Sequence, residues 1–173
     1  MKRILLLFTI GLIGLQSCNN AQGAEKKTEV ASTTYYLVRH AEKDLNDPNT
    51  ANPQLTPEGV VRAMNYAEYF KDKGIDAVYS TDYIRTQETA RPTAEMAGVP
   101  VLSYDPNSGK IDGIPMGQNV LIVGHSNTIP QLANSLAEVN TYTELDEATE
   151  YGTMFIITRN EDGTIQHRVE KND

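Results

Sequence analysis

Four side chains that could bind or attack an anion come shortly after apolar segments of the sequence. Arg39 and His40 end one such segment, Arg85 follows a second, and His125 ends a third. If these segments are neighbouring parallel strands, their carboxyl ends meet at one edge of a sheet, where such folds bind their ligands. Guanidinium groups match phosphate oxygens two at a time. The four residues therefore predict a compact cationic pocket for a phosphoryl group.

A histidine in such a pocket could also act as a nucleophile. A neutral imidazole can attack phosphorus and form a covalent phosphohistidine, while arginines stabilise the charge on the phosphoryl oxygens. Helix N-termini after Thr81 and Ser126 would add backbone N–H donors, so Ser126 is a further candidate for phosphate binding. The alternative is that His40 and His125 are core residues and that both arginines pair with surface acids. Histidines that end apolar strands would be poor core residues, whereas His167, on the last expected strand, is expected to be inert.

The elements around these residues alternate between strand and helix patterns. Residues 33–38 are rich in β-branched and aromatic side chains and predict a first strand. Thr56 and Pro57 predict a helix start, and Gly74 is expected to close that helix in the left-handed conformation. Further strands are expected at 75–79, 99–104 and 119–123, and a hairpin at 151–158 and 164–169. Two more helices are expected, one at 82–96 that is kinked or divided at Pro92, and one at 129–136. This order predicts an α/β fold, a three-layer α/β/α sandwich with a mostly parallel central sheet.

Composition excludes several classes of protein. The 173 residues fit a single domain, and a hydrophobic content of 39% excludes a polytopic membrane protein. A net charge of −8 argues against a nucleic-acid partner, which would call for a basic face, and is compatible with a monomer. One cysteine excludes a disulfide scaffold, and three histidines leave few ways to build a metal site. We expect neither metal nor cofactor, because the arginines can take the place of a metal ion.

The N-terminal residues resemble an export signal. Lys2 and Arg3 precede an apolar run at 4–15, which is too short to cross a hydrocarbon core of about 30 Å. The run leads into Leu-Gln-Ser-Cys at 15–18, which looks like the lipobox of bacterial lipoproteins. We expect a signal peptide at 1–17, a flexible tether at 18–32 and a catalytic domain at 33–173, with the exported protein held at a membrane of the cell envelope by lipid on Cys18. The alternative is a plain signal peptide followed by a stray cysteine.

Four motifs, taken together and in order, resemble the histidine phosphatase (phosphoglycerate mutase-like) superfamily. They are Leu-Val-Arg-His-Ala-Glu at 37–42, Leu-Thr-Pro-Glu-Gly with Arg-Ala at 55–63, Ser-Thr-Asp-Tyr-Ile-Arg-Thr-Gln-Glu-Thr-Ala at 80–90, and Val-Gly-His-Ser at 123–126. The resemblance implies a phosphoglycerate mutase-like fold with His40 as the nucleophile. It also implies phosphoryl binding by Arg39, Arg85 and His125. Asn46 falls where many members have an asparagine that contacts phosphate.

The general acid is the departure from this family pattern. Many members carry a glutamate in a long insertion between the second arginine and the second histidine, and that insertion is short here. Asp105 lies roughly where the acid would fall, although Asp-Pro-Asn is equally typical of a turn. Glu42 is a second candidate. A third possibility is that no acid is needed, which suits substrates with good leaving groups.

The resemblance and the export signal together favour an exported phosphomonoesterase. Its substrate would be a sugar phosphate, an envelope-glycan phosphate or scavenged phosphate esters. Small phosphohistidine phosphatases have a similar size, but their protein substrates are cytosolic, whereas a glycolytic mutase would be longer. The second class is a non-catalytic lipoprotein that binds phosphate or glycan.

Overall fold

The computed structural model describes residues 31–46 and 50–172. The expected signal peptide, Cys18 and nearly all of the expected tether lie outside the described residues. Within those residues, no helix has the length and apolar character needed to cross a membrane.

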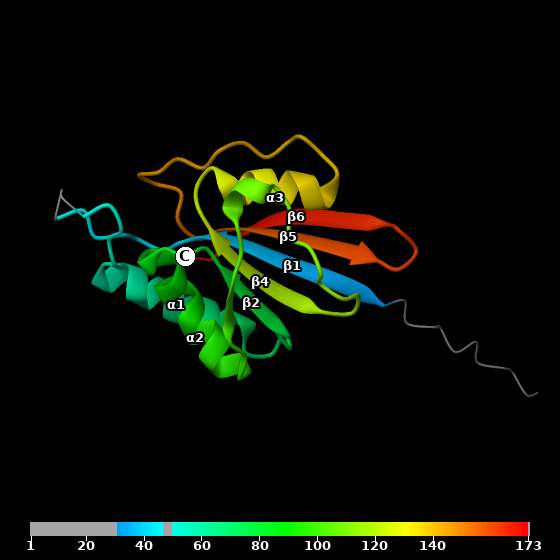
Figure 1. Ribbon diagram of the computed structural model, residues 1–173, viewed down its shortest axis with the longest axis horizontal. Helices are drawn as coiled ribbons and strands as arrows, with labels where there is room; N and C mark the ends of the chain where they lie inside the picture. The colour runs from blue at the N-terminus through cyan, green and yellow to red at the C-terminus, as the bar shows by residue number, and fades with distance from the viewer. Residues whose placement is uncertain (1–30, 47–49, 173) are drawn as a thin grey trace, which may run out of the picture.

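Six strands form one mixed sheet in the order β3-β2-β4-β1-β5-β6 (Figure 1). The strands are β1 (Ser32–Arg39), β2 (Ala77–Ser80), β3 (Val101–Ser103), β4 (Asn119–Gly124), β5 (Thr153–Asn160) and β6 (Ile165–Lys171). β1 to β4 run parallel to one another, whereas β5 pairs antiparallel with β1 and with β6. The expectation of a mostly parallel sheet is therefore confirmed, and the two C-terminal strands form the expected hairpin.

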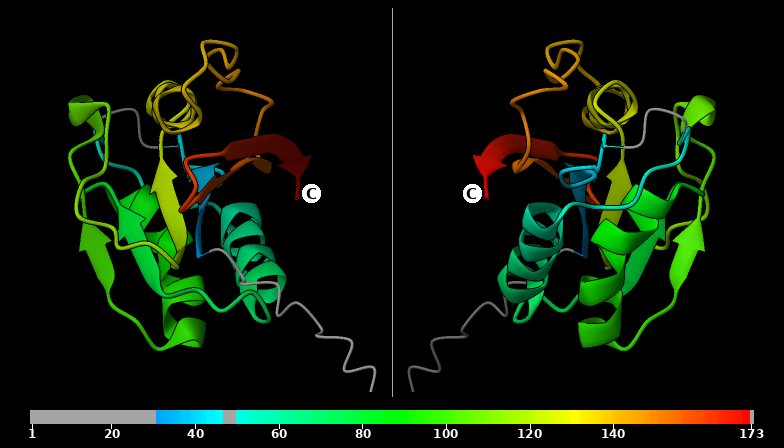
Figure 2. Two further views of the ribbon diagram at one scale, coloured as in Figure 1. Left: turned by 90° about the vertical axis from the view of Figure 1, so that its right-hand side faces the viewer. Right: turned by 90° about the vertical axis from the view of Figure 1, so that its left-hand side faces the viewer.

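Three helices cover the two faces of the sheet, as the two views of Figure 2 show. They are α1 (Pro57–Phe70), α2 (Ile84–Ala97) and α3 (Thr128–Ala137), and a short 3-10 helix, η1 (Pro106–Ser108), follows β3. Side chains alternate along the central strands between two buried clusters. Leu37 and Ile122 pack under α3, while Val38 and Val123 pack under α1 and α2. The three-layer α/β/α arrangement follows directly from this alternation.

Local sequence signals explain the start of α1 and the end of α2. The Thr56 hydroxyl accepts the Gly59 N–H at 3.1 Å, and Pro57 opens α1 as expected. Gly98, with φ of 70°, closes α2, and its N–H reaches the carbonyls of Ala94 and Glu95.

One expectation about a helix end is wrong, and one of the two alternatives at Pro92 is not met. α1 ends at Phe70, so Gly74, whose φ is 58°, belongs to the turn that leads to β2 and does not close the helix. α2 is not divided at Pro92, which lies inside a single helix. A proline removes one N–H donor, and the remaining bonds of α2 and its packing against α1 and the sheet hold the helix together.

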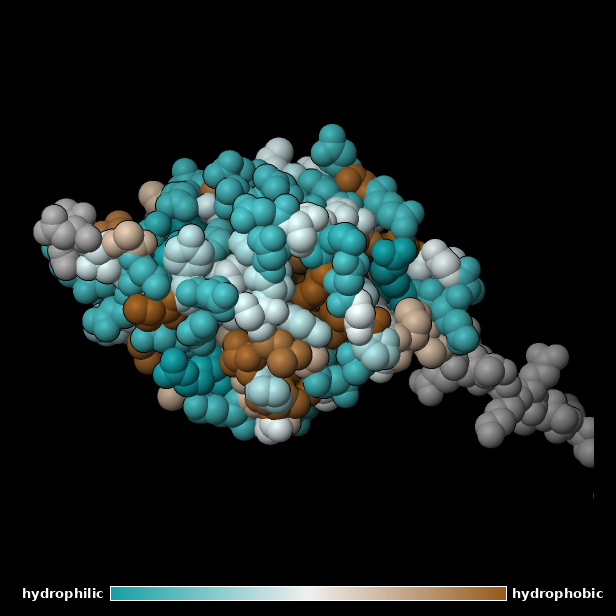
Figure 3. Space-filling model, in the orientation of Figure 1, coloured by the Kyte–Doolittle hydropathy of each residue, from teal (hydrophilic) through white to brown (hydrophobic). Residues whose placement is uncertain are grey.

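The visible surface is mainly polar. Figure 3 shows a largely hydrophilic face on which hydrophobic side chains gather in small groups. Exposed apolar side chains on α1 include Val60, Val61 and Met64. Such isolated residues are ordinary on a folded domain.

Candidate active site

Three parallel strands carry the predicted residues to one edge of the sheet. β4 lies between β1 and β2, with Arg39 opposite Gly124 and Ser80 opposite Val123. The His40 N–H donates to the Gly124 carbonyl at 2.9 Å, which continues the ladder beyond β1. The structure thereby places the His40 and His125 rings edge to face, with centroids 5.7 Å apart.

The His40 ring is buried and held in one tautomer. Its side chain is 1% exposed, and Nδ1 lies 2.7 Å from the Ala41 carbonyl oxygen. A carbonyl can only accept, so Nδ1 carries the proton and the neutral ring keeps its lone pair on Nε2. The pKa of His40 is lowered to about 3, mainly by burial, and the charges of Arg39 and Arg85 lower it as well. The hydrogen bond to Ala41 acts in the opposite direction and raises the pKa. The imidazole is therefore neutral at physiological pH, with Nε2 available as a nucleophile.

His125 is neutral for similar reasons and has the opposite tautomer. Its Nδ1 lies 3.4 Å from Nη2 of Arg85, which can only donate, so Nδ1 accepts. Nε2 then carries the proton and donates to the Thr81 hydroxyl at 3.0 Å. Burial, followed by the charge of Arg85, lowers the pKa of His125 to about 4.

Arg85 offers donors that the described protein does not use. Its first-turn position on α2 brings the guanidinium beside His125 and over the Tyr83 ring, 4.4 Å from the ring centroid. The Nε and Nη1 atoms are buried and have no hydrogen-bond partner among the described residues. Leaving buried donors unpaired is costly, which favours an anion at this position.

Arg39 is turned toward the loop between α3 and β5. Its side chain is buried, and Nη1 and Nη2 donate to the carbonyls of Asp146 at 3.0 Å and Glu147 at 2.9 Å. The guanidinium also covers the Tyr151 ring at 4.3 Å from its centroid, while Nε has no partner among the described residues. In this structure Arg39 thus holds the loop, and Nε is the atom left for a ligand.

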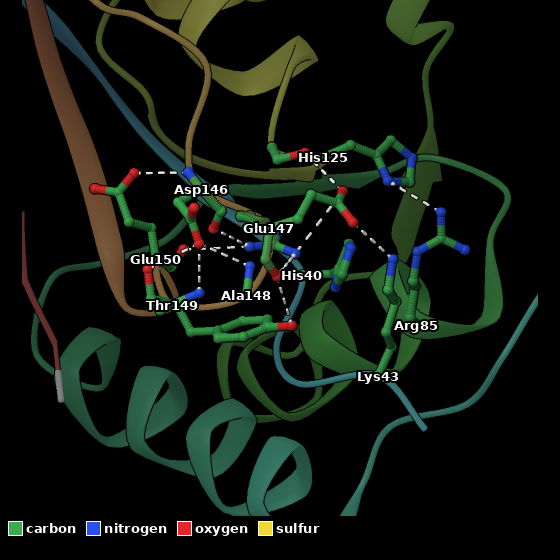
Figure 4. A network of polar contacts seen from close by, with 12 residues as sticks. His40, Lys43, Arg85, His125, Asp146, Glu147, Ala148, Thr149 and Glu150 are labelled. Carbon is green, nitrogen blue, oxygen red and sulfur yellow. Dashed lines mark hydrogen bonds and ion pairs between the residues drawn. The ribbon is translucent and has the colours of Figure 1, made fainter. Parts of the chain in front are cut away.

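Glu147 is the site residue that sequence reasoning missed. Its carboxylate accepts from the Ser126 hydroxyl at 2.8 Å and from Lys43 Nζ at 3.0 Å, and lies 3.9 Å from Arg39 Nη2 (Figure 4). The hydrogen bonds from Lys43 and Ser126, reinforced by the positive charges, lower the pKa of Glu147 to about 2. No motif marks this residue, because it sits in an acidic stretch far from the motifs that carry the family resemblance.

The two candidates for a general acid each have partners of their own. The exposed Asp105 carboxylate accepts the Asn107 backbone N–H at 2.9 Å and so begins η1, which is the geometry of a turn. Glu42 pairs with Arg62 of α1, with oxygen and nitrogen 2.8 Å apart.

Asn46 and His167 have local partners. Asn46 is exposed, and its backbone N–H donates to Asp44 at 2.9 Å. His167 lies on β6, where its Nδ1 is 2.6 Å from the Tyr142 hydroxyl.

A pocket of about 270 Å³ opens beside His125. It is lined by Tyr83, Arg85, Pro106, Asn107, His125, Asn127, Thr128 and Glu147. The short segment after β3 thus forms one wall of the pocket through its backbone turn. In residues 31–46 and 50–172 there is no group of three or more His, Cys, Asp or Glu side chains placed to hold a metal.

Comparison with known sequences agrees with this geometry. Residues 35–106 match the family model described as "Histidine phosphatase superfamily (branch 1)". The "Putative phosphoserine phosphatase 2" of Hydrogenobacter thermophilus is 36% identical over 67 residues, which is 36% of this chain and 33% of that protein. The "Probable phosphoglycerate mutase GpmB" of Enterobacter sp. strain 638 is 35% identical over 81 residues, or 44% of this chain and 37% of that protein. The chain thus matches little more than a third of the length of these curated relatives.

Solved structures share the fold over most of their length. The protein histidine phosphatase SixA, solved with tungstate, has a TM-score of 0.59 at 15% identity, covering 80% of this chain and 97% of that one. YhfR of Bacillus stearothermophilus has a TM-score of 0.58 at 19% identity, covering 82% and 98%. Residues 35–106 thus resemble the histidine phosphatase superfamily in sequence, and the solved structures share the fold. The histidine phosphatase model ends at residue 106, so the placement of His125 rests on the register of β4 beside β1.

Proposed function

We propose that this protein is a phosphomonoesterase that works through a phosphohistidine on His40 and needs no metal. The observation that carries the proposal is the state of His40, whose Nδ1–H is fixed on the Ala41 carbonyl at 2.7 Å. The lone pair therefore lies on Nε2, in a ring that is close enough to Arg85 to feel its charge, and Arg85 has unpartnered donors. A neutral nucleophile next to a fixed positive charge is suited to attack a phosphoryl group.

The reaction takes place in two displacements. In the first, Nε2 of His40 forms a bond to phosphorus, the ester P–O bond breaks, and its electron pair leaves with the alcohol oxygen, which takes up a proton. In the second, water attacks the phosphohistidine, loses a proton, and the P–N bond breaks. The electron pair returns to Nε2, and inorganic phosphate departs. Each step restores the balance of atoms and charge without an external cofactor.

The surrounding residues position the phosphoryl group and balance its charge. Arg85 offers its unpartnered Nε and Nη1 donors to the phosphoryl group. Its Nη2 faces Nδ1 of His125. The Thr81 hydroxyl orients the His125 ring from its other nitrogen. The Nε and Nη1 donors of Arg85 can stabilise the charge of the transition state without having to reorganise, while His125 holds Arg85 through Nδ1.

Hydrolysis of p-nitrophenyl phosphate in the presence of a chelator tests this proposal. The p-nitrophenolate ion leaves without a proton, so hydrolysis of this substrate needs the nucleophile and the phosphate-binding groups but no general acid. The wild-type protein should turn it over, and His40→Ala should lose activity by several orders of magnitude. His167→Ala is the matched control, because its ring lies on β6 and contacts Tyr142 instead of the site. Equal activity of wild type and His40→Ala would overturn the proposal.

A sugar phosphate or an envelope-glycan phosphate is the substrate class that we favour. The support is the export pattern at 1–18 together with an open pocket walled by a short turn. The fold also occurs in a glucosyl-3-phosphoglycerate phosphatase of mycobacteria, with a TM-score of 0.58 at 12% identity. A panel of sugar phosphates, phosphate esters and a phosphohistidine protein separates this class from its alternatives.

Two alternatives remain in that panel. The likeness to SixA favours a protein phosphohistidine phosphatase, and preferential cleavage of the phosphohistidine protein would select it. A non-catalytic lipoprotein that binds phosphate or glycan would bind members of the panel and release no phosphate. The neutral His40 nucleophile favours catalysis over binding alone.

We also propose that the protein is exported and carries lipid on Cys18, with the folded domain held at the envelope as a monomer. The support lies in the sequence, where the chain's single cysteine falls at the end of the lipobox-like segment. Cells grown on labelled palmitate should incorporate label into the wild type and not into Cys18→Ser. Absence of label on the wild type would refute the lipid anchor while leaving the catalytic proposal unaffected.

A further inference from the structure

A loop between α3 and β5 brings a negative charge into the cationic site. Leu145 is buried, and its N–H donates to the Ser126 carbonyl at 3.0 Å, which fixes the loop next to His125. Arg39 holds the same loop through the carbonyls of Asp146 and Glu147. The Glu147 side chain then extends from this fixed backbone toward the two histidines (Figure 4).

The Glu147 carboxylate meets groups that a phosphoryl group would need. It accepts from the Ser126 hydroxyl at 2.8 Å and from Lys43 at 3.0 Å, and it faces Arg39 at 3.9 Å. Its charge also acts on Arg85 and His125 from across the pocket. An internal anion thus partly balances the positive charges of the site.

We propose that Glu147 is a specificity-determining residue whose carboxylate occupies part of the phosphoryl position, so that an incoming phosphoryl group must displace it. The inference rests on the proposed function, since it concerns the same pocket. A carboxylate carries one negative charge, whereas a phosphomonoester carries close to two at neutral pH. The dianion therefore competes for Lys43 and Ser126 better than a singly charged diester does.

The surroundings of Glu147 allow this exchange. Its side chain is 57% exposed, and the neighbouring residues 146–149 are exposed as well. Displacement therefore breaks two hydrogen bonds and the longer contact with Arg39, and it uncovers no apolar core. The backbone can stay in place, because Leu145 and Arg39 anchor it independently of the carboxylate.

Binding of inorganic phosphate to wild type, Glu147→Gln and Glu144→Gln tests the inference by calorimetry at low ionic strength. Phosphate can bind only while the Glu147 carboxylate is out of the site, so its apparent affinity is reduced in proportion to the fraction of time that the site is open. Removing the carboxylate should therefore tighten phosphate binding by about tenfold. Glu144→Gln removes the same charge from the same exposed loop and controls for the general electrostatic effect. It should change the phosphate affinity by less than about twofold.

Steady-state kinetics provide a second readout that a merely structural role would not move. Glu147→Gln should lower KM for p-nitrophenyl phosphate with little change in kcat, and it should weaken the preference for phosphate over dimethyl phosphate as an inhibitor. An unchanged or weaker phosphate affinity in Glu147→Gln would overturn the inference, as would an equal gain in Glu144→Gln. If the wild type binds phosphate and Arg85→Ala does not, the proposed phosphate site stands. A failed Glu147 result then counts only against the role of Glu147. If no variant binds or hydrolyses phosphate esters, the proposed function fails as well.

Discussion

The reactivity of His40 depends on what its other ring nitrogen contacts. The Ala41 carbonyl accepts a hydrogen bond from Nδ1–H of His40, and burial with the nearby arginines keeps the ring from gaining a second proton. A neutral imidazole with one defined free nitrogen results. His125 has the reverse arrangement, because Arg85 faces its Nδ1. Two histidines 5.7 Å apart thus have different tautomers that their neighbours impose.

Replacement of Arg85 should disable the site. Arg85→Ala removes the unpartnered donors and the positive charge beside His125, and a transition-state arginine is worth about 10³–10⁵-fold in phosphoryl transfer. We expect kcat/KM for p-nitrophenyl phosphate to fall by that order, and Arg85→Lys to recover only part of the loss because it lacks the planar fork. Arg91→Ala, on the exposed side of the same helix, is the control and should leave kcat/KM unchanged. Near-normal activity of Arg85→Ala would show that the phosphoryl group binds elsewhere.

The sequence points to His40, Arg85 and His125 more reliably than to the residues around them. Each of the three follows a strand whose apolar pattern is plain, so the parallel register alone brings them together. Arg39 is next to His40 in sequence, yet the alternation of a strand sends its side chain away, toward the loop before β5. Glu147 enters through that loop, and no periodic pattern describes where a loop places a carboxylate.

At the scale of elements, a close contact ties α1 to the catalytic segment. A Cβ on Gly59 would lie 2.3 Å from the Glu42 carbonyl oxygen, which also accepts the Thr56 N–H. Only glycine lets the first turn of α1 rest on the backbone just after His40. The Leu-Thr-Pro-Glu-Gly motif thus positions the nucleophile through packing.

Gly59→Ala should therefore destabilise the protein, although alanine is the better helix former. We expect a loss of about 1–3 kcal/mol in the free energy of unfolding, as for other overpacked sites. Denaturant titration would measure it, with Val60→Ala on the exposed side of the same turn as the control. A Gly59→Ala protein as stable as the wild type would mean that this contact is not tight.

Helix starts and strand centres follow from the sequence better than helix ends do. The start of α1 can be predicted because the partner of the Thr56 hydroxyl is local: the hydroxyl accepts a hydrogen bond from the N–H of Gly59. The end of α1 depends instead on where its apolar face leaves the sheet, and Gly74 serves the following turn. Pro92 is tolerated within α2 for the same kind of reason, since packing against α1 and the sheet outweighs a local signal.

For the molecule as a whole, buried neutral histidines make stability depend on pH. The folded His40 has its pKa lowered to about 3, while the unfolded chain takes up a proton near the ordinary value of 6.5. Between these values the unfolded state binds more protons, so stability falls as pH decreases, by about 1.4 kcal/mol per pH unit from this residue. His40→Gln should show a correspondingly shallower slope from pH 6 to 5. Equal slopes for both proteins in chemical denaturation would contradict the lowered pKa.

The overall charge of the chain conceals the character of its site. The sequence carries a net charge of −8, yet Arg39 and Lys43 lie against Glu147, whose negative charge also acts on Arg85. A negative surface with a local cationic site favours anionic ligands that are small enough to enter it. The net charge gives no hint of this site, whereas the strand-end residues predict it and the fold adds Lys43 and Glu147.

The central claim, a phosphohistidine on His40, is tested most directly by trapping it. Intact-protein mass spectrometry of enzyme quenched during turnover of p-nitrophenyl phosphate should find one phosphoryl group on the wild type, and peptide mapping should place it on His40. The group should be labile in acid and absent from His40→Ala. Rapid hydrolysis with no phosphoryl group on the protein, or with one on another residue, would contradict the account.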